Sequence, residues 1–506
     1  MKNNNEKRGG AERLFDAVTE IDHDLVDGSR PKDAKRRSHA VRNGIIAAVV
    51  AAAMALGVVG GIALHERRGK NAGGADEKTP APAVDDRERF NPFVVSAEYP
   101  VYETAKENNE AVRERGRQVS DKAKDVLATL AKSCLINGGT ENGLVAPASI
   151  YMALGILADI SSGETQRQIL DLLNSENTDE VSEDAGAIWD ACYSKGNIIK
   201  ELDPRLSTLD DDGVHSVLGA SLWLDNNREY NMELLRSIAE KYRASSFSGR
   251  FGTDEFNKVF CDWLSDQTGG MLSAAEPGFD PETVFGVATT VYVKNYWSPR
   301  FDPSKNTDGL FHGAEGDEKC VFMNREDRFT VFRGDRFTFI GLELCDPVHI
   351  QSHVWFVLPD EGQDIDSVVS SDDLWEFICN FEGEIEDREN NKITVTVPKF
   401  EINGECDLIP YLSDLGVTDV FETGKADLSP LGITDPDVYV NLFAHNAHVV
   451  VDENGFEGAG ISSFGLTLGI DESVSVDEFV LDRPFVFIMT NSSGLPLFAG
   501  VVNQIN

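Results

Sequence analysis

Two pairs of histidines come closest to the spacing of a metal or catalytic site. His349 and His353 stand in the sequence HIQSH, and His445 and His448 stand in HNAH. Both pairs lie in strand-like runs, so their spacing does not gather two rings on one helical face. We interpret both pairs as hydrogen-bonded histidines of the core rather than as metal ligands.

The sequence contains no pattern of a familiar catalytic centre. It has no GxSxG elbow, no HExxH motif, no P-loop and no glycine-rich dinucleotide loop. The seven cysteines include no CxxC pair and no spacing suited to zinc. We therefore predict no enzyme, no catalytic residue, no metal site and no cofactor. Buried free thiols are expected, with one or two disulfides as the alternative.

The net charge of −40 is concentrated in the larger, C-terminal part of the chain. Residues 93–506 carry 30 basic and 72 acidic side chains, whereas residues 1–92 are nearly balanced. Such a surface repels phosphate backbones, so nucleic acid is excluded as a partner. Solubility is the simplest interpretation of the acidity, and a monomer is expected.

One apolar segment near the N-terminus has the length of a membrane span. Gly44–Leu64 is uncharged over 21 residues, which suffices to cross a hydrocarbon core as a helix. Six basic residues between Arg30 and Arg42 precede it, so the positive-inside rule keeps residues 1–43 cytoplasmic and exports the rest. We expect an uncleaved anchor, with a cleaved signal peptide and a secreted protein as the alternative.

Composition divides the chain into four parts. We predict a cytoplasmic tail over 1–43, a transmembrane helix over 44–64, a flexible linker over 65–92 and a folded domain over 93–506. Within that domain, helical patterns at 107–135, 149–173, 229–243 and 253–267 precede strand-like runs from Val284 onward. Helices early and strands late indicate an α+β fold with mostly antiparallel sheets.

An unusually long connection separates two of the last predicted strands. The strand-like runs AHVVV and VLDRPFVFIMT flank DENGFEGAGISSFGLTLGIDESVSVDEF, Asp452–Phe479. A connection of this length inside a compact domain is usually functional or disordered.

Several fragments, taken together, carry a resemblance to a known family. They are LVAPASIYMALGILADISSGETQRQIL, VYVKNYWSPRF, WFVLPDEG, VTVPKFEINGECDLIPYLSDLGVTDVFETGKADLSPL, VVVDENG and RPFVFIMTNSSGLPLFAGVV. In this order, over 144–506, the sequence resembles the serpins, a family of serine protease inhibitors. The resemblance implies three β-sheets with about eight or nine helices and an exposed reactive-centre loop. A membrane-anchored member suggests a bacterial surface protein.

The resemblance also implies a mechanism for the long connection, which would be the reactive-centre loop. A serine or cysteine protease would attack a loop bond and form an acyl-enzyme. The cut loop would then enter the main sheet as an extra strand and distort the protease before deacylation. The alternative is a non-inhibitory binding or structural surface protein whose loop is cut without trapping.

The loop's side-chain pattern allows insertion as a strand. If alternation starts at Glu453, the inward positions are uncharged, and no proline interrupts the strand. The residues that match the family's hinge are Glu453, Gly455, Phe456, Glu457, Gly458, Ala459 and Gly460. Phe456 stands where the family has a small hydroxyl residue, and we expect overpacking there to cost about 1–3 kcal/mol.

Three further residues match the family's positions beside the sheet opening. Ser149 and His445 match the shutter serine and histidine, and Trp297 matches the breach tryptophan. Ala146 and Thr289 replace a serine and an asparagine of the family's shutter.

The loop composition indicates the type of protease. Counting as in the family places the scissile bond at Gly469–Ile470, within the window Thr467–Ser473. Phe456–Asp482 contains no lysine or arginine, so trypsin-like enzymes have no basic residue to bind. We expect an extracytoplasmic serine protease of elastase-like or subtilisin-like specificity.

Overall fold

The order of secondary structure follows the sequence prediction, with most helices before most strands. A computed structural model describes residues 58–64 (backbone only), 93–98, 118–136, 139–193, 215–272, 281–344, 352–379, 381, 392–459, 478–491 and 494–505. All of them belong to one unit, Met54–Asn506. The predicted tail 1–43 and linker 65–92 lie outside the described residues.

Several of the helices begin where a polar side chain caps their first turn. Ser120, Asn231 and Thr253 each accept hydrogen bonds from backbone N–H groups that the helix itself leaves unpaired. The described residues contain nine α-helices: α4 Asp121–Leu135, α5 Pro147–Asp159, α6 Gly163–Leu172, α7 Thr178–Cys192, α9 Met232–Tyr242, α10 Asp254–Gln267, α11 Ile365–Val369, α12 Asp372–Ile378 and α13 Ile409–Asp414.

The helical pattern predicted over 149–173 is divided into two helices. α5 ends at Asp159 and α6 begins at Gly163, whose φ of 61° lies in the left-handed region. Glycine adopts that conformation without steric cost, so the chain turns there. The helical character predicted within 149–173 is confirmed, and the chain forms two helices there rather than one.

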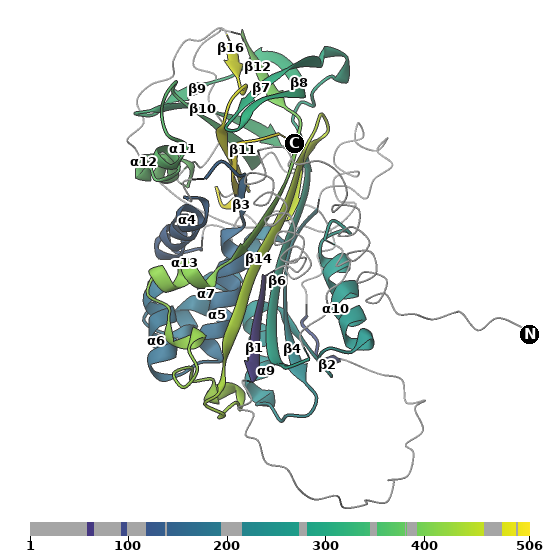
Figure 1. Ribbon diagram of the computed structural model, residues 1–506, viewed down its shortest axis with the longest axis vertical. Coiled ribbons are helices and arrows are strands. Elements are labelled where there is room, and N and C mark those ends of the chain that lie inside the picture. Colours follow the sequence, from purple (N-terminus) through teal and green to yellow (C-terminus); the bar gives the residue numbers. More distant parts are fainter. Residues whose placement is uncertain are drawn as a thin grey trace, which may run out of the picture. The chain divides into compact units, whose positions relative to one another are not determined.

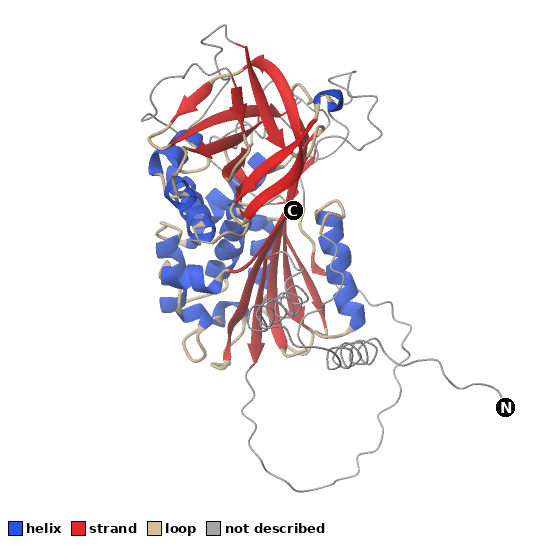
Figure 2. Cartoon of the chain, turned by 45° about the horizontal axis from the view of Figure 1, so that its top comes forward, coloured by secondary structure: helices blue, strands red, loops and turns tan. Residues whose placement is uncertain are grey.

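The strands of the described residues form three sheets (Figures 1 and 2). The largest has the order β1-β14-β15-β6-β4-β5-β2, with β13 paired to β14. Its strands are β1 Val58–Leu64, β2 Phe93–Val95, β4 His215–Asp225, β5 Ala244–Gly249, β6 Thr283–Tyr296, β13 Phe400–Asp407, β14 Val438–Val451 and β15 Gly455–Ala459. We refer to this as the large sheet.

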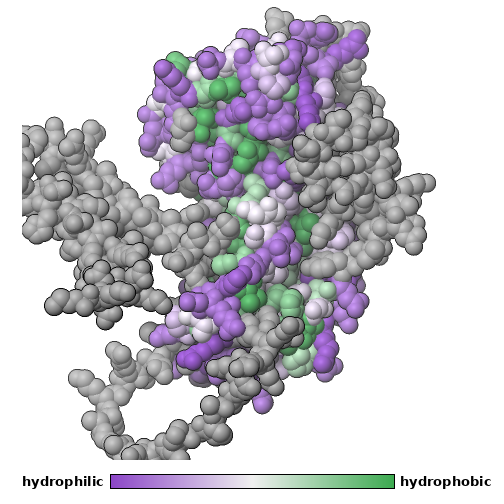
Figure 3. Space-filling model, turned by 90° about the vertical axis from the view of Figure 1, so that its right-hand side faces the viewer, coloured by the Kyte–Doolittle hydropathy of each residue, from purple (hydrophilic) through white to green (hydrophobic). Residues whose placement is uncertain are grey.

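Two smaller sheets complete the strand-rich end. The six-stranded sheet has the order β3-β18-β17-β11-β10-β9, and the four-stranded sheet has the order β16-β12-β8-β7. Their strands are β3 Gly143–Val145, β7 Thr307–Gly313, β8 Gly316–Arg328, β9 Val331–Arg333, β10 Phe337–Leu344, β11 Ser352–Pro359, β12 Lys392–Pro398, β16 Glu478–Val480, β17 Phe485–Thr490 and β18 Pro496–Val502. Hydrophilic side chains cover much of this end in the view of Figure 3.

Helices cover both faces of the large sheet. α5 and its neighbours pack on one face, and α10 packs on the opposite face against β4 and β6 (Figure 1). Successive side chains of β4 point to opposite faces of the sheet. Leu222 packs in the main hydrophobic core, and Trp223 packs in an aromatic cluster under α10. A sheet covered on both faces explains why β6 is buried at nearly every position.

The predicted transmembrane helix over Gly44–Leu64 differs from the structure in its last third. Residues 58–64 form the strand β1, and residues 44–57 lie outside the described residues. Among the described residues, no helix has the length and apolar character required to cross a membrane. The run VVGGIAL contains β-branched residues, which favour a strand, and two glycines, which disfavour a helix.

Candidate functional site

The first strand of the long connection already lies inside the large sheet. β15 pairs with β14 on one side and with β6 on the other, antiparallel to both. β6 and β14 are therefore parallel to each other, and β15 runs between them in the opposite direction. We call the boundary between β6 and β14 the seam.

A tight turn at Asp452–Asn454 reverses the chain between β14 and β15. The Asp452 carboxylate accepts hydrogen bonds from the backbone N–H groups of Asn454 at 2.7 Å and Gly455 at 3.3 Å. Aspartate commonly stabilises turns in this way, by bonding to the backbone two residues further on. The turn fixes the point at which the connection enters the seam.

Trp297 holds that turn from the end of β6. Its indole N–H donates to the Asp452 carbonyl at 2.7 Å, and its backbone N–H donates to the Asn454 carbonyl at 3.0 Å. The ring is 1% exposed and packs edge-on against Phe301. Trp297 thus fastens the start of β15 to the neighbouring strand.

Gly455 is the position of closest backbone approach in the turn. A Cβ atom there would lie 1.9 Å from the Asn295 carbonyl oxygen and 2.7 Å from Cα of Tyr296. Both obstacles are backbone atoms, which cannot move aside as a flexible side chain could. Only glycine permits this pairing with β6.

Phe456 points inward and is fully buried. Its ring lies 5.3 Å from that of Phe498 and 6.2 Å from that of Phe487, both in the six-stranded sheet beneath. These separations are normal for aromatic pairs. The overpacking expected at this position is therefore not observed, because the two phenylalanines of β17 and β18 form a site for the ring.

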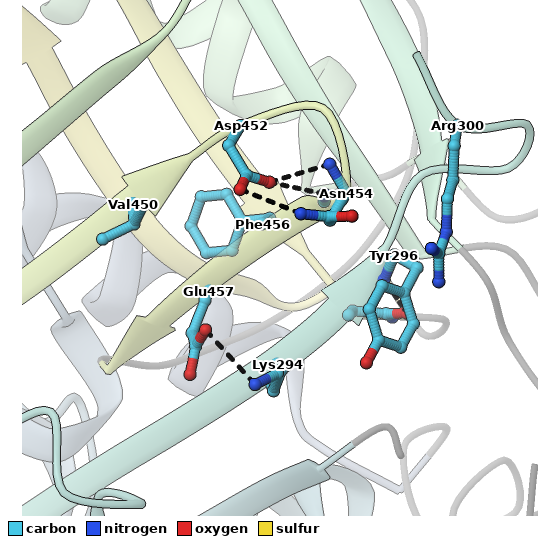
Figure 4. A pocket seen from close by; sticks show the side chains of 10 residues that line it. Lys294, Tyr296, Arg300, Val450, Asp452, Asn454, Phe456 and Glu457 are labelled. Atoms are coloured by element: carbon cyan, nitrogen blue, oxygen red, sulfur yellow. Dashed lines mark hydrogen bonds and ion pairs between the residues drawn. The ribbon is translucent and has the colours of Figure 1, made fainter. Parts of the chain in front are cut away.

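Glu457 points to the opposite face, as the alternation predicts. The Tyr292 hydroxyl donates to its carboxylate at 2.8 Å, and the Lys294 ammonium lies 3.5 Å from it. Figure 4 shows Glu457 and Lys294 facing each other across β15 and β6. This partly exposed ion pair ties the hinge residue Glu457 to β6.

Glu453 is held by groups from a different part of the fold. Its carboxylate pairs with Lys399 at 2.8 Å and accepts a hydrogen bond from the Asn306 amide. Partial burial opposes the charged form, but the hydrogen bonds from Lys399, the Glu453 backbone and Asn306 outweigh it and lower the pKa of Glu453. The carboxylate therefore stays ionised at neutral pH.

A buried hydrogen-bond chain crosses beneath the seam. The Ala146 N–H donates to Nε2 of His445 at 3.0 Å, and the Ser149 hydroxyl donates to the Ala146 carbonyl at 3.0 Å. The Thr289 hydroxyl donates to the Ser149 carbonyl at 2.9 Å. The chain links β14, the start of α5 and β6, and so connects the two strands on either side of the seam.

Burial sets the protonation state of His445. The ring is 1% exposed, and desolvation lowers its pKa to about 4. Nδ1 has no hydrogen-bond partner in the described part of the chain. His445 is thus neutral at pH 7 and accepts a hydrogen bond through Nε2.

A cavity of about 430 Å³ opens beside the turn. Residues of β6, of β15 and of the turn before β15 line it, including Lys294, Glu457 and Asp452 (Figure 4). Arg300 stacks over the ring of Tyr296 at 4.4 Å on its margin. The cavity marks unfilled space at the entrance of the seam.

A family model described as serpin (serine protease inhibitor) matches residues 121–505. This chain belongs to the serpin family. Its membership agrees with the prediction that the protein is not an enzyme. The matched range also includes the turn, the seam and the hydrogen-bond chain beneath it.

Curated relatives and solved structures agree with this assignment. The serpin is 27% identical to rat alpha-1-antiproteinase over 76% of this chain and 89% of that protein. It is 27% identical to Serpin-ZX of Arabidopsis thaliana over 75% of this chain and 94% of the relative. Arabidopsis AtSerpin1 in its native stressed conformation superposes with a TM-score of 0.60, at 23% identity, over 78% of this chain and 98% of that chain.

Most of the predicted site residues of the serpin come together at the seam. Trp297, Glu453, Gly455, Phe456 and Glu457 surround the turn, and the backbone of Gly458 and Ala459 continues β15. Ser149 and His445 lie in the chain beneath the sheet. Gly460 and the predicted scissile bond Gly469–Ile470 lie outside the described residues.

The side chains that bind the two glutamates at the seam were not predicted from the sequence. Tyr292 and Lys294 hold Glu457, while Lys399 and Asn306 hold Glu453. The available signal was that Lys399 belongs to the quoted PKF run, and that Tyr292 and Lys294 belong to the quoted run VYVKNYWSPRF. Which carboxylate each would meet depends on the sheet register, which a single sequence does not reveal.

Proposed function

We propose that this serpin is a suicide-type inhibitor of extracytoplasmic serine proteases with elastase-like or subtilisin-like specificity. The protease cuts the loop within Thr467–Ser473, becomes an acyl-enzyme and is trapped as the loop enters the large sheet. The observation that carries the proposal is that β15 already lies between β6 and β14.

The energetics of the seam support insertion of the rest of the loop. Residues that follow β15 into the seam, once β1 is displaced, would form backbone hydrogen bonds alternately to β14 and to β6, worth about 0.5–1.5 kcal/mol each. Phe456 is already buried, so the largest hinge side chain presents no further obstacle. The absence of lysine and arginine from Phe456–Asp482 supports a protease that accepts small or apolar residues.

The setting outside the cytoplasm stays a prediction from the N-terminal sequence. Gly44–Leu64 is the segment that would export the chain and anchor it at a bacterial surface. A cysteine protease is a second type of target, because it too forms an acyl-enzyme.

Incubation with pancreatic elastase tests the proposal. We expect a covalent adduct that survives SDS, with its junction mapped by mass spectrometry to Thr467–Ser473. Trypsin serves as the matched control and should give no adduct at the loop. Rapid cleavage by elastase without an adduct would contradict inhibition and favour the non-inhibitory alternative.

A further inference from the structure

A second segment of the chain also lies in the seam. β1 pairs with β14, where Val59 stands opposite Ala444 and Leu64 opposite Val438. It also pairs with β6, where Val59 stands opposite Ala288 and Ala63 opposite Thr283. β1 is antiparallel to both strands, as β15 is.

β15 and β1 therefore occupy two parts of one strand position. β15 takes the part beside the turn, opposite residues 448–451 of β14 and 293–296 of β6. β1 takes the distant part, opposite residues 438–444 of β14 and 283–289 of β6. Both run in the same direction, as two pieces of a single inserted strand would.

If the pairing of β15 with β14 is continued along the chain, it shows which loop residues would take the strand position that β1 occupies. Ala459 stands opposite His448, so the loop would bring Ser463 opposite Ala444. With the irregularity that β1 already shows after Gly61, Leu468 would reach Val438. Counting along β6 from Gly458 opposite Val293 gives the same result, with Ser463 opposite Ala288.

We propose that Val58–Leu64 binds the distant half of the seam and competes there with loop residues Ser463–Leu468. The two segments are chemically similar: both are uncharged, and the register superposes Gly61 on Gly465 and Ile62 on Leu466. An inserting loop must displace β1 and exchanges one set of strand hydrogen bonds for another. Its net gain is therefore smaller than in an empty seam.

Competition has a consequence for inhibition, and this part rests on the proposed function. Slower insertion gives an acyl-enzyme more time to hydrolyse, so β1 shifts the protein from inhibitor towards substrate. Withdrawal of Val58–Leu64 from the sheet removes the obstacle. The segment cannot be β1 and part of a 21-residue membrane helix at the same time.

Disulfide trapping in the full-length chain tests the strand position. Ala63 stands opposite Tyr439, so the pair Ala63→Cys/Tyr439→Cys places two sulfurs at cross-strand distance. Val59→Cys/Tyr439→Cys is the control, because Val59 pairs with Ala444 and lies far out of register. After mild oxidation and blocking of free thiols, peptide mapping should find the 63–439 link and no 59–439 link.

Two results would contradict the position of β1 in the seam. One is an equal yield of the 63–439 and 59–439 disulfides. The other is no 63–439 link together with protection of the segment from protease by phosphatidylcholine vesicles, which would favour a membrane span. Either outcome leaves the elastase test of the proposed function unaffected.

A proline variant tests the competition. Gly61→Pro removes a backbone N–H from the middle of β1 and should release the strand from the seam. We expect a larger fraction of elastase in covalent adduct than with the unsubstituted chain. An unchanged adduct fraction would contradict competition. If the 63–439 link forms, but neither the unsubstituted chain nor Gly61→Pro gives an adduct with elastase, the proposed function is contradicted. The position of β1 in the seam would still stand.

Discussion

The indole N–H of Trp297 donates to the carbonyl oxygen of Asp452 across 2.7 Å. This bond joins the end of β6 to the residue that follows β14, so one buried side chain spans the entrance of the seam. The two strands that flank β15 are thus fastened to the turn where the loop enters.

Trp297→Phe should remove this hydrogen bond while keeping an aromatic ring at the position. The Asp452 carbonyl loses its buried donor, which costs about 1–3 kcal/mol of unfolding free energy. We expect a lower urea midpoint and faster cleavage of the loop by dilute protease. Trp375→Phe is the matched control, because that indole donates to the Val369 carbonyl at the same 2.7 Å in a distant helix. Equal acceleration of loop cleavage in both variants would contradict a specific role for Trp297.

Gly455→Ala should prevent β15 from pairing with β6. The new methyl group would lie 1.9 Å from the Asn295 carbonyl oxygen, so the strand must withdraw. We expect loss of protection from hydrogen exchange over residues 455–459 and loss of the elastase adduct. Gly186→Ala is the control, because the nearest atom to its Cβ is 3.8 Å away. Retained protection at 455–459 would contradict the close approach described for Gly455.

His445 should make the fold sensitive to mild acid. Burial lowers its pKa to about 4, whereas the unfolded chain has a value near 6.5. The unfolded state therefore binds a proton first as the pH falls. The stability that the neutral ring contributes is complete above pH 6.5 and is lost between pH 6.5 and 4, by roughly 3 kcal/mol in total.

Urea unfolding at pH 7 and pH 5 measures this dependence. His445→Gln removes the titrating group while keeping an acceptor for the Ala146 N–H, so part of the difference between the two pH values should disappear. His448, which is half-buried beside Glu401, provides the control. His448→Gln should keep the full difference in stability between the two pH values. An identical pH dependence in the His445 variant would contradict the assignment to this ring.

Local patterns predicted much of the fold and part of the site. The alternation that places Phe456 inward and Glu457 outward follows from strand geometry alone, and the structure confirms it for both residues. The helix over 254–267 was also predicted closely, because a threonine cap and an apolar stripe mark it.

Contacts between distant segments could not be predicted in the same way. The site that receives Phe456 is built from Phe487 and Phe498, and no feature near residue 456 indicates it. The partner of His445 is a backbone N–H, which every residue type except proline offers. For Val58–Leu64, an apolar run can be a membrane helix or a buried strand, and periodicity does not distinguish the two.

We propose that the intact serpin relaxes to a more stable form when its loop is cut and enters the seam. The most direct test is the melting temperature of the intact chain against a sample nicked once within Thr467–Ser473. We expect the nicked sample to melt at a clearly higher temperature, because its loop extends β15 along the whole seam in place of the shorter β1. Identical melting temperatures for the two samples would contradict it.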